Sequence, residues 1–330
     1  MRKSSFHLPW CVFFLTTVLL CNACSVSIQN QNATLEQPHN SDAESKIVEL
    51  TPSDPIEYDT FVPSLPVLQS AGSGTPAPVL ILLYHNITEL SAPGTYDRRL
   101  QDFESDLNYL KDNNITVIRL SDILRIQSGE IVPEEGQQFA VITFDDGYFS
   151  QYSKAFFLLK EYGMPATFFI ITSFVGTTDY MTWEEIGEMA SYSPGNGQQP
   201  FFEFGSHTVD HRSLTYDAST FPDKNDYIMF LNMELNQSKN AILEHVNQTN
   251  IFLALPYGDG AYEEEVLYAA VRTDYTGIRT SIYGAFDAYN TNWNYHLPCV
   301  AILGSTDIGV LPDYYEQLLP ETGLLRLSIR

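Results

Sequence analysis

The feature that most constrains the fold is a repeated alternation, from residue 79 onward, of short apolar runs with segments of helical periodicity. Residues 79–83 and 139–144 are apolar runs of strand length. Between them, Phe103, Leu107 and Leu110 recur at the spacing of one helical face. Strands that alternate with helices of this size usually pair in parallel. The sequence therefore predicts an α/β fold with a largely parallel sheet, either open or closed.

The later predicted elements continue this alternation. Strands are predicted at residues 116–120, 166–171, 201–204, 251–255, 276–279 and 299–303, and helices at residues 154–162, 226–246 and 263–271. Thr182 is predicted to cap a further helix that begins at Trp183, because Glu185 stands in the capping-box position. A chain of 330 residues can bury one sizeable core, so we expect one folded domain with appended segments.

The N-terminal part has a different composition. Arg2 and Lys3 precede an apolar run from Leu8 to Leu20, which is typical of a signal peptide and short for a membrane span. The residues around Cys24 resemble a bacterial lipobox, in which that cysteine becomes lipidated. We therefore expect an exported protein, either extracellular or anchored by Cys24 at the outer face of a bacterial membrane.

These features divide the chain into three predicted parts. Residues 1–24 are a signal peptide of the lipoprotein type, and residues 25–76, rich in Ser, Thr, Asn, Gln and Pro, are a flexible polar linker. Residues 77–330 form the folded domain. Cys299 is the one cysteine beyond residue 24, so a disulfide framework is not expected and we interpret this thiol as a small core residue. The oligomeric state is left open.

The charge of the chain argues against one class of partner. The chain contains 17 Lys and Arg residues and 41 Asp and Glu residues, which gives a formal net charge of -24. Proteins bind nucleic acids largely by neutralising phosphates with Lys and Arg. Nucleic acid is therefore not an expected partner, and we attribute the acidity to solubility.

Two adjacent carboxylates follow one of the predicted strands. Asp145 and Asp146 come directly after the apolar run and are followed by Gly147. Functional groups of parallel α/β proteins gather at the carboxyl ends of strands. Neighbouring residues of a strand point to opposite faces, but a turn permitted by Gly147 can aim both carboxylates at one site. Asp-Asp-Gly is also an ordinary turn, so this motif needs support from others.

Two histidines supply that support. His207 and His211 follow the predicted strand 201–204, and their spacing on a helical turn would place both imidazoles on one side. With Asp146 they make a set of two histidines and one carboxylate that leaves coordination positions open for water and substrate. Such a set accepts Zn, Co, Ni or Fe, of which we expect Zn. A third segment, Pro256-Tyr257-Gly258, is by itself typical of an ordinary turn from a strand into a loop.

In this order, the segments resemble the motifs of polysaccharide deacetylases, the NodB homology domain of carbohydrate esterase family 4. Residues 143–147 (Thr-Phe-Asp-Asp-Gly) match the first motif, residues 206–211 (Ser-His-Thr-Val-Asp-His) the second, and residues 256–258 the end of the third. The resemblance extends over roughly residues 79–308. It implies a distorted (β/α) barrel and a metal-dependent hydrolase that removes N-acetyl groups from an acetylated polysaccharide.

The resemblance also implies roles for individual residues. Asp145 would be the catalytic base, and Asp146, His207 and His211 the metal ligands. The backbone N–H of Tyr257, beside Pro256, would stabilise the oxyanion. Two aromatic residues that are close in sequence to the motifs, Tyr148 and Trp183, are candidates for lining the cleft.

Two departures from the family pattern indicate a branch. The third motif usually carries an arginine that orients the base, but Ala254 stands there. A Leu-x-His motif is missing near the C-terminus, whereas residues 83–85 (Leu-Tyr-His) supply one at the start of the domain. This arrangement resembles the circularly permuted branch that includes deacetylases of biofilm poly-N-acetylglucosamine. It implies that His85 is the catalytic acid, with His296 as the alternative.

Other functions remain open at this stage. The same site could remove O-acetyl groups from xylan or another glycan. A glycan-binding homologue without catalysis is a second alternative, although it would be expected to lack Asp145 or a metal ligand, and all are present. A metalloprotease is disfavoured because the His-Glu-x-x-His motif is missing from the sequence.

Overall fold

A computed structural model describes residues 75–195 and 200–319. The chain divides into two units, residues 1–62 and 63–330, and all described residues belong to the second. The predicted signal peptide, Cys24 and nearly all of the predicted linker lie outside the described residues. No helix in residues 75–195 or 200–319 is long and apolar enough to cross a membrane.

The described residues form a closed parallel barrel, which confirms the predicted fold class. In the described part of the chain seven parallel strands pair around the barrel. Their order around it is β1 (Pro78–Tyr84), β11 (Leu297–Ala301), β9 (Gly277–Tyr283), β8 (Phe252–Ala254), β7 (Phe202–Ser206), β6 (Ala166–Ile170) and β5 (Phe139–Phe144). The pairing of β1 with β5 closes the ring.

Shorter strands extend this sheet at the amino-terminal end of the barrel. There β10 (Phe286–Asp287) pairs with the start of β1, and β4 (Thr116–Val117) pairs with the start of β5. A separate pair, β2 (Asn86–Thr88) and β3 (Asp97–Arg99), follows β1.

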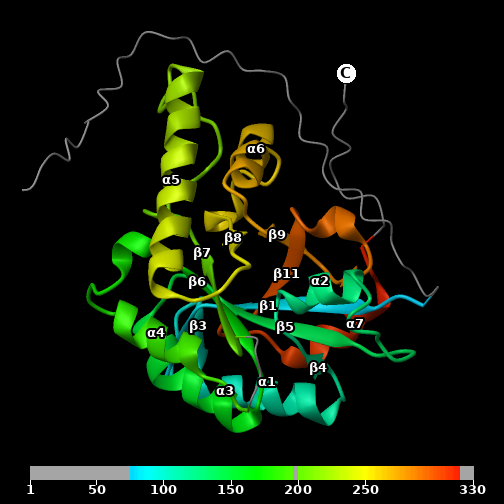
Figure 1. Ribbon diagram of the computed structural model, residues 1–330. Helices are drawn as coiled ribbons and strands as arrows, with labels where there is room; N and C mark the ends of the chain where they lie inside the picture. Colours follow the sequence, from blue (N-terminus) through cyan, green and yellow to red (C-terminus); the bar gives the residue numbers. More distant parts are fainter. Residues whose placement is uncertain (1–74, 196–199, 320–330) are drawn as a thin grey trace, which may run out of the picture. The chain divides into compact units, whose positions relative to one another are not determined.

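Helices cover the outside of the barrel. Figure 1 shows α5 and α6 on one side of the strands, and α1 and α3 on the other. The α-helices are α1 (Leu100–Asp112), α2 (Asp122–Gln127), α3 (Phe157–Tyr162), α4 (Trp183–Ser191), α5 (Lys224–His245), α6 (Glu264–Arg272) and α7 (Leu311–Glu316). Short 3₁₀ turns lie at Thr172–Phe174, Pro256–Gly258, Thr291–Trp293 and Ile308–Val310. Thr182 caps α4 in a capping box with Glu185, as predicted.

The alternation along each strand creates two apolar layers. On β1, Val79, Ile81 and Leu83 belong to a cluster inside the barrel, while Leu80 and Leu82 belong to the larger cluster between barrel and helices. A strand buried on both faces needs apolar residues at every position, which explains the continuous apolar runs of the sequence. Cys299 lies inside the barrel and is 1% exposed, so its interpretation as a core residue is confirmed.

Two predicted elements differ from the structure. The predicted strand 116–120 keeps only Thr116–Val117, because the backbone and side chain of Arg119 hydrogen-bond to Asp122 and begin the turn into α2. The predicted helix 154–162 begins earlier, with a wider π-helical turn at Gln151–Phe156, before α3. Such turns are rare and often occur at functional sites.

Candidate active site

The two carboxylates lie at the carboxyl-terminal mouth of the barrel. Asp145 follows β5 and continues the alternation of Val141 and Thr143, and its backbone N–H donates to the carbonyl of Tyr84 at 2.9 Å. Asp146 has a φ of 77°, and Gly147 a φ of 82°. The chain therefore reverses at Asp146 itself as well as at the predicted Gly147, and this brings the second carboxylate to the same mouth.

The histidine segment corrects one expectation. Residues 207–211 are not helical, because Thr208 and His211 have positive φ values of 65° and 54°. The prediction of a helical turn was therefore wrong. The segment is an irregular loop after β7, yet it still brings the two rings together, with their centroids 4.7 Å apart.

Three side chains form a possible metal site. Oδ1 of Asp146 lies 3.5 Å from Nε2 of His207 and 3.6 Å from Nε2 of His211. All three donor atoms lie within 4.8 Å of one another. Donors bound to one zinc ion at about 2.0–2.2 Å are about 3–3.5 Å apart, so the observed spacing fits a divalent ion with little movement.

The surroundings of these donors also fit a cation. The Nδ1 atom of His207 lies 2.9 Å from the carbonyl oxygen of Ala254, which directs Nε2 toward Asp146. Burial lowers the pKa of His207 to about 4, so the ring is neutral at pH 7, the form that binds metals. Burial and the neighbouring charge of Asp145 raise the pKa of Asp146 to about 7, and a cation beside this carboxylate would favour its ionised form.

Asp145 has a cationic partner that the sequence reasoning missed. The guanidinium of Arg279, which is 1% exposed, donates to Oδ2 of Asp145. Burial alone would raise the pKa of Asp145, but the positive charge nearby, that of Arg279 above all, outweighs it, so the pKa is lowered. Oδ2 also lies 3.6 Å from Nε2 of His207, so this ionised carboxylate borders the candidate metal site.

Arg279 lies beside the position at which the third motif lacks its arginine. It belongs to β9, and the strand register pairs it directly with Ala254 of β8, the position at which the family arginine was expected. The sequence did contain a signal for this residue. Arg279 stands in a predicted buried strand, and arginines are seldom buried without a charged partner.

His85 lies on the same mouth. It follows β1, continues the inward alternation of Leu83, and interacts electrostatically with Asp145. Its pKa is lowered mainly by burial, an effect that the charge of Asp145 opposes. Among the described residues Nδ1 has no hydrogen-bond partner, and the ring of Tyr96 packs against the imidazole at 4.9 Å between centroids. His296, the alternative acid, is 8% exposed and hydrogen-bonds to the backbone of Ala261.

The remaining predicted site residues occupy different places. The Tyr148 hydroxyl hydrogen-bonds to Asp146, and its ring stacks on Tyr180. Tyr257 has a φ of 59° after the buried Pro256, and its ring, 69% exposed, packs against His211 at 4.6 Å. Trp183 instead stacks on His245 of α5, with ring centroids 4.2 Å apart.

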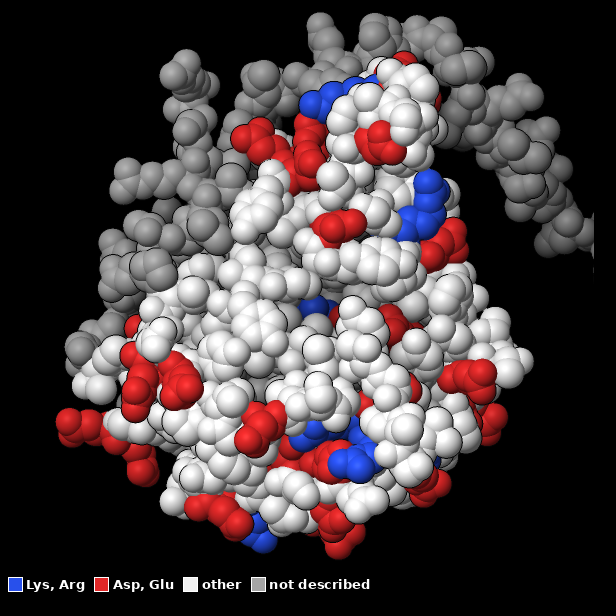
Figure 2. Space-filling view, turned by 180° about the vertical axis from the view of Figure 1, so that it is seen from behind, with Lys and Arg blue, Asp and Glu red and all other residues white. Residues whose placement is uncertain are grey.

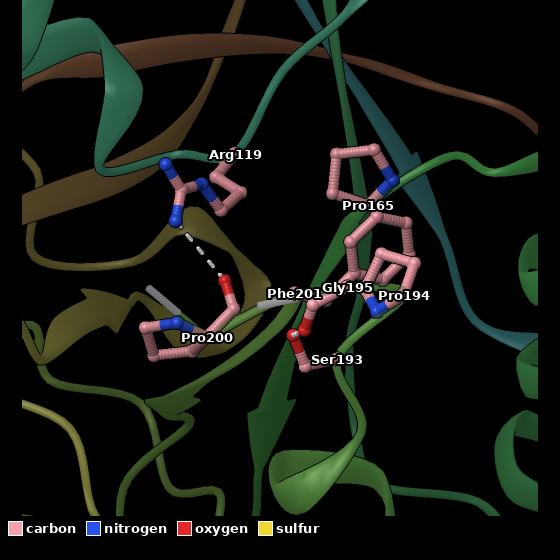
Figure 3. A pocket seen from close by; sticks show the side chains of 7 residues that line it. All are labelled: Arg119, Pro165, Ser193, Pro194, Gly195, Pro200 and Phe201. Carbon is pink, nitrogen blue, oxygen red and sulfur yellow. Dashed lines mark hydrogen bonds between the residues drawn. The ribbon is translucent and has the colours of Figure 1, made fainter. Parts of the chain in front are cut away.

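A cavity of about 410 Å³ lies elsewhere on the domain (Figure 3). Its lining residues are Arg119, Pro165, Ser193, Pro194, Gly195, Pro200 and Phe201. Pro165 and Phe201 directly precede β6 and β7, so the cavity lies at the opposite end of the barrel from the carboxylates and histidines. Arg119 is turned toward Pro200 and donates to its carbonyl at 3.1 Å. This cavity is therefore not part of the site.

Comparisons with known proteins agree with this geometry. The family model for polysaccharide deacetylase matches residues 133–278. The chain is 28% identical over 272 residues to the "Putative polysaccharide deacetylase YxkH" of Bacillus subtilis (strain 168), covering 82% of this chain and 85% of that protein. It is 27% identical over 164 residues to the poly-beta-1,6-N-acetyl-D-glucosamine N-deacetylase of Staphylococcus epidermidis. That match covers 48% of this chain and 53%, about half, of the relative.

A solved structure supports the fold. The Streptococcus pyogenes deacetylase PplD, in complex with acetate, superposes with a TM-score of 0.61 at 24% sequence identity. The superposition covers 74% of this chain and all of that one. The comparisons agree on one point: residues 133–278 match the polysaccharide deacetylase family, and the chain is similar to named polysaccharide deacetylases.

Proposed function

We propose that the protein is a metal-dependent N-deacetylase that releases acetate from an N-acetylglucosamine-containing polysaccharide of the cell surface or extracellular matrix. One observation carries the proposal. The Asp146, His207 and His211 donors converge beside an ionised Asp145, whose Oδ2 lies 3.6 Å from Nε2 of His207. A cation site next to a carboxylate base is the arrangement needed to hydrolyse an amide with water.

The metal ligands would be Asp146, His207 and His211, and zinc is the proposed ion, with Co, Ni or Fe as alternatives. A divalent ion held there would supply Lewis acidity, which would polarise the acyl carbonyl and lower the pKa of water. Nδ1 of His207 is engaged by the carbonyl of Ala254, so only Nε2 of that ring is free to face the ion. Tyr148 holds the Asp146 carboxylate by a hydrogen bond from its hydroxyl.

Asp145 would act as the general base. The Arg279 guanidinium occupies Oδ2, while Oδ1 is buried and has no hydrogen-bond partner among the described residues. Oδ1 is therefore the atom able to take a proton from the attacking water. Arg279 would prevent rotation of the carboxylate and keep it ionised until the proton arrives.

His85 would protonate the departing amine. Its Nδ1 atom is buried without a partner in the described part of the chain, and its ring shares the mouth with Asp145. The side chain of Gln151 donates to the backbone carbonyls of both His85 and Asp145, so one residue of the π-helical turn links the proposed acid and base. The backbone N–H of Tyr257 is the proposed oxyanion donor.

The surface around the site supports a neutral glycan as substrate. Tyr96 and Tyr257 are 60% and 69% exposed, and their rings touch His85 and His211 respectively. Tyrosine rings of this kind offer an apolar face together with a polar tip, which suits sugars. Figure 2 shows one face of the domain, where acidic side chains are scattered and basic ones are few, so a polyanionic ligand would find little attraction there.

The substrate proposal has support from one relative. The Staphylococcus epidermidis protein is named for deacetylation of poly-beta-1,6-N-acetyl-D-glucosamine. Its matched region spans about half of that protein, so the same polymer is a proposal for this chain. We further propose export, with an anchor at Cys24 that leaves the domain outside the cell.

The test is acetate release from a panel of acetylated glycans, with and without a chelator. We expect release from oligomers of β-1,6-linked N-acetylglucosamine, and loss of the activity on chelation with recovery on addition of Zn²⁺ or Co²⁺. Faster release from O-acetylated xylan would instead favour an esterase. Binding of glycan without any acetate release would favour the non-catalytic alternative.

A further inference from the structure

The loop that carries His207 and His211 needs support from outside itself. Thr208 and His211 have positive φ values, which side-chain-bearing residues seldom adopt without a compensating interaction. Within the loop, Ser206 Oγ accepts from the backbone N–H of Thr208 at 3.1 Å, and Thr208 Oγ1 accepts from that of His211 at 3.2 Å. The backbone N–H groups of the two middle residues, Val209 and Asp210, are bound from elsewhere.

Those two groups are bound by a carboxylate of α5. Oε2 of Glu234 accepts from the backbone N–H of Val209 at 2.9 Å and from that of Asp210 at 3.0 Å. Glu234 is 0% exposed, and its Oε1 has no hydrogen-bond partner among the described residues. One helical turn later, Ser238 Oγ lies 2.7 Å from Oγ of Ser206, the last residue of β7, so a second residue of α5 reaches the point at which the loop begins.

A buried glutamate is unexpected on this face of α5. Its neighbours Leu231 and Leu235 are buried in the apolar layer between helix and barrel. Burying a carboxylate is unfavourable unless hydrogen bonds compensate, and here the described bonds all go to the ligand loop. A leucine would suit the packing of the helix better, so packing alone does not explain the residue.

We propose that Glu234 is a positioning residue that holds the loop of His207 and His211 in its metal-binding conformation and thereby sets the affinity of the site for its cation. The inference rests on the proposed metal site. Glu234 acts through the backbone, because its carboxylate binds Val209 and Asp210 rather than the imidazoles. Partners that orient metal ligands influence affinity strongly although they do not touch the ion.

The test compares cation affinity with fold stability in three variants of the full chain. Metal-free protein is titrated with Zn²⁺ and with Co²⁺, and thermal unfolding of the metal-free form is measured alongside. Glu234→Leu removes the acceptor and should weaken cation binding about tenfold to hundredfold. Glu234→Gln keeps an acceptor but loses its charge and should weaken binding by about three- to tenfold.

Ile242→Ala is the matched control. Ile242 is fully buried on α5, two turns beyond Glu234, and belongs to the apolar layer. Its truncation creates a cavity and should lower the unfolding midpoint by several degrees, yet leave the cation affinity within about twofold of wild type. A merely structural role for Glu234 predicts the same behaviour as Ile242→Ala.

The outcomes separate this inference from the proposed function. If wild type binds the cation and Glu234→Leu binds it as tightly as Ile242→Ala does, the positioning role is wrong and the metal site stands. Should Glu234→Leu not fold, Glu234→Gln decides, and unchanged affinity in that variant overturns the role. A wild-type protein that binds neither Zn²⁺ nor Co²⁺ would overturn the proposed function, and this inference with it.

Discussion

The two ends of the barrel use the same residue types in opposite ways. At the mouth, Asp145 is bound to Arg279 through one oxygen, and its other oxygen is buried without a hydrogen-bond partner among the described residues. At the amino-terminal end of the barrel, opposite the mouth and called the closed end below, both oxygens of Asp122 are bound. Arg119 donates to Oδ1 and Oδ2, and Arg125 donates to Oδ1. Both oxygens of the carboxylate are therefore bound at that end of the barrel, whereas only one is bound at the mouth.

The distribution of unsatisfied groups follows this division. Buried side-chain atoms without a hydrogen-bond partner in the described residues occur at His85, Asp145, Gln151, Glu234, Arg279, Arg125 and Trp293. The first five belong to the mouth or its supporting residues, whereas the buried Glu203 at the closed end is bound by Ser121 and Thr167. Unpaired buried groups are costly, so their concentration at the mouth supports the proposal that the active site lies there.

The largest effect is expected from removal of a proposed metal ligand at the mouth. His211→Ala should lose most of the bound divalent ion, and with it nearly all deacetylation, because a site with three protein ligands cannot spare one. Metal content of the purified protein is measured by elemental analysis beside acetate release. Wild type should carry about one ion per chain. If the variant retained all of its metal, His211 would not be a ligand of the ion.

The next effect separates the adjacent carboxylates. Asp145→Asn should keep the metal but lower turnover about a hundredfold or more, the scale of a missing general base. Asp146→Asn should instead lose metal. If metal content falls in the first variant and is unchanged in the second, the two roles have been exchanged.

His85→Ala tests the proposed catalytic acid. The variant should bind metal and substrate nearly normally, while turnover falls by roughly a hundredfold to ten-thousandfold, because the acid acts on the leaving amine. His296→Ala is the control, since His296 is bound to the Ala261 backbone and should affect folding more than turnover. Near-wild-type turnover of the His85 variant on acetylated glucosamine oligomers would move the acid role to His296.

The residues of the candidate site differ in how well they could be predicted from the sequence. Asp145, Asp146, His207 and His211 each follow an apolar run, and the rule that functional groups gather at strand ends was enough to place them together. The barrel could be predicted as an α/β fold from the same alternation, because most of its strands are buried on both faces.

The missed features depend on contacts between distant segments. Arg279 reaches Asp145 because the register of β9 against β8 puts it beside Ala254, and no local pattern reveals a register. The loop of His207 and His211 was expected to be helical, but a carboxylate from α5 holds its backbone in another conformation. Local propensity is a weak guide where tertiary hydrogen bonds decide the backbone.

At the closed end, the matching substitution should affect stability and spare catalysis. Asp122→Asn removes a buried charge from between Arg119 and Arg125, and should lower the free energy of unfolding at pH 7 by about 1–3 kcal/mol. Turnover should stay within about twofold of wild type. Denaturant unfolding and acetate release are measured on the same samples, and a large loss of turnover would contradict the division between the two ends.

The stability effect should also depend on pH. Burial alone would raise the pKa of Asp122, but hydrogen bonds from Arg119 and Arg125 outweigh it, so the folded pKa is lowered. Such a group adds stability above its unfolded pKa of about 3.9, and this contribution is lost as the pH falls through the lower folded value. The difference between wild type and Asp122→Asn should therefore shrink below about pH 4.

The smallest effect is expected at the rim of the mouth, where Tyr96 exposes 60% of its surface and packs one side of its ring against His85. If this ring stacks on a sugar, Tyr96→Ala removes about 1 kcal/mol of binding and should raise KM about fivefold, with kcat nearly unchanged. Tyr96→Phe keeps the ring and should behave as wild type. Val132→Ala is the control at the closed end, where an even more exposed apolar side chain precedes β5. Because uniform binding energy appears in KM alone, a fall in kcat for Tyr96→Ala would show instead that the ring positions His85.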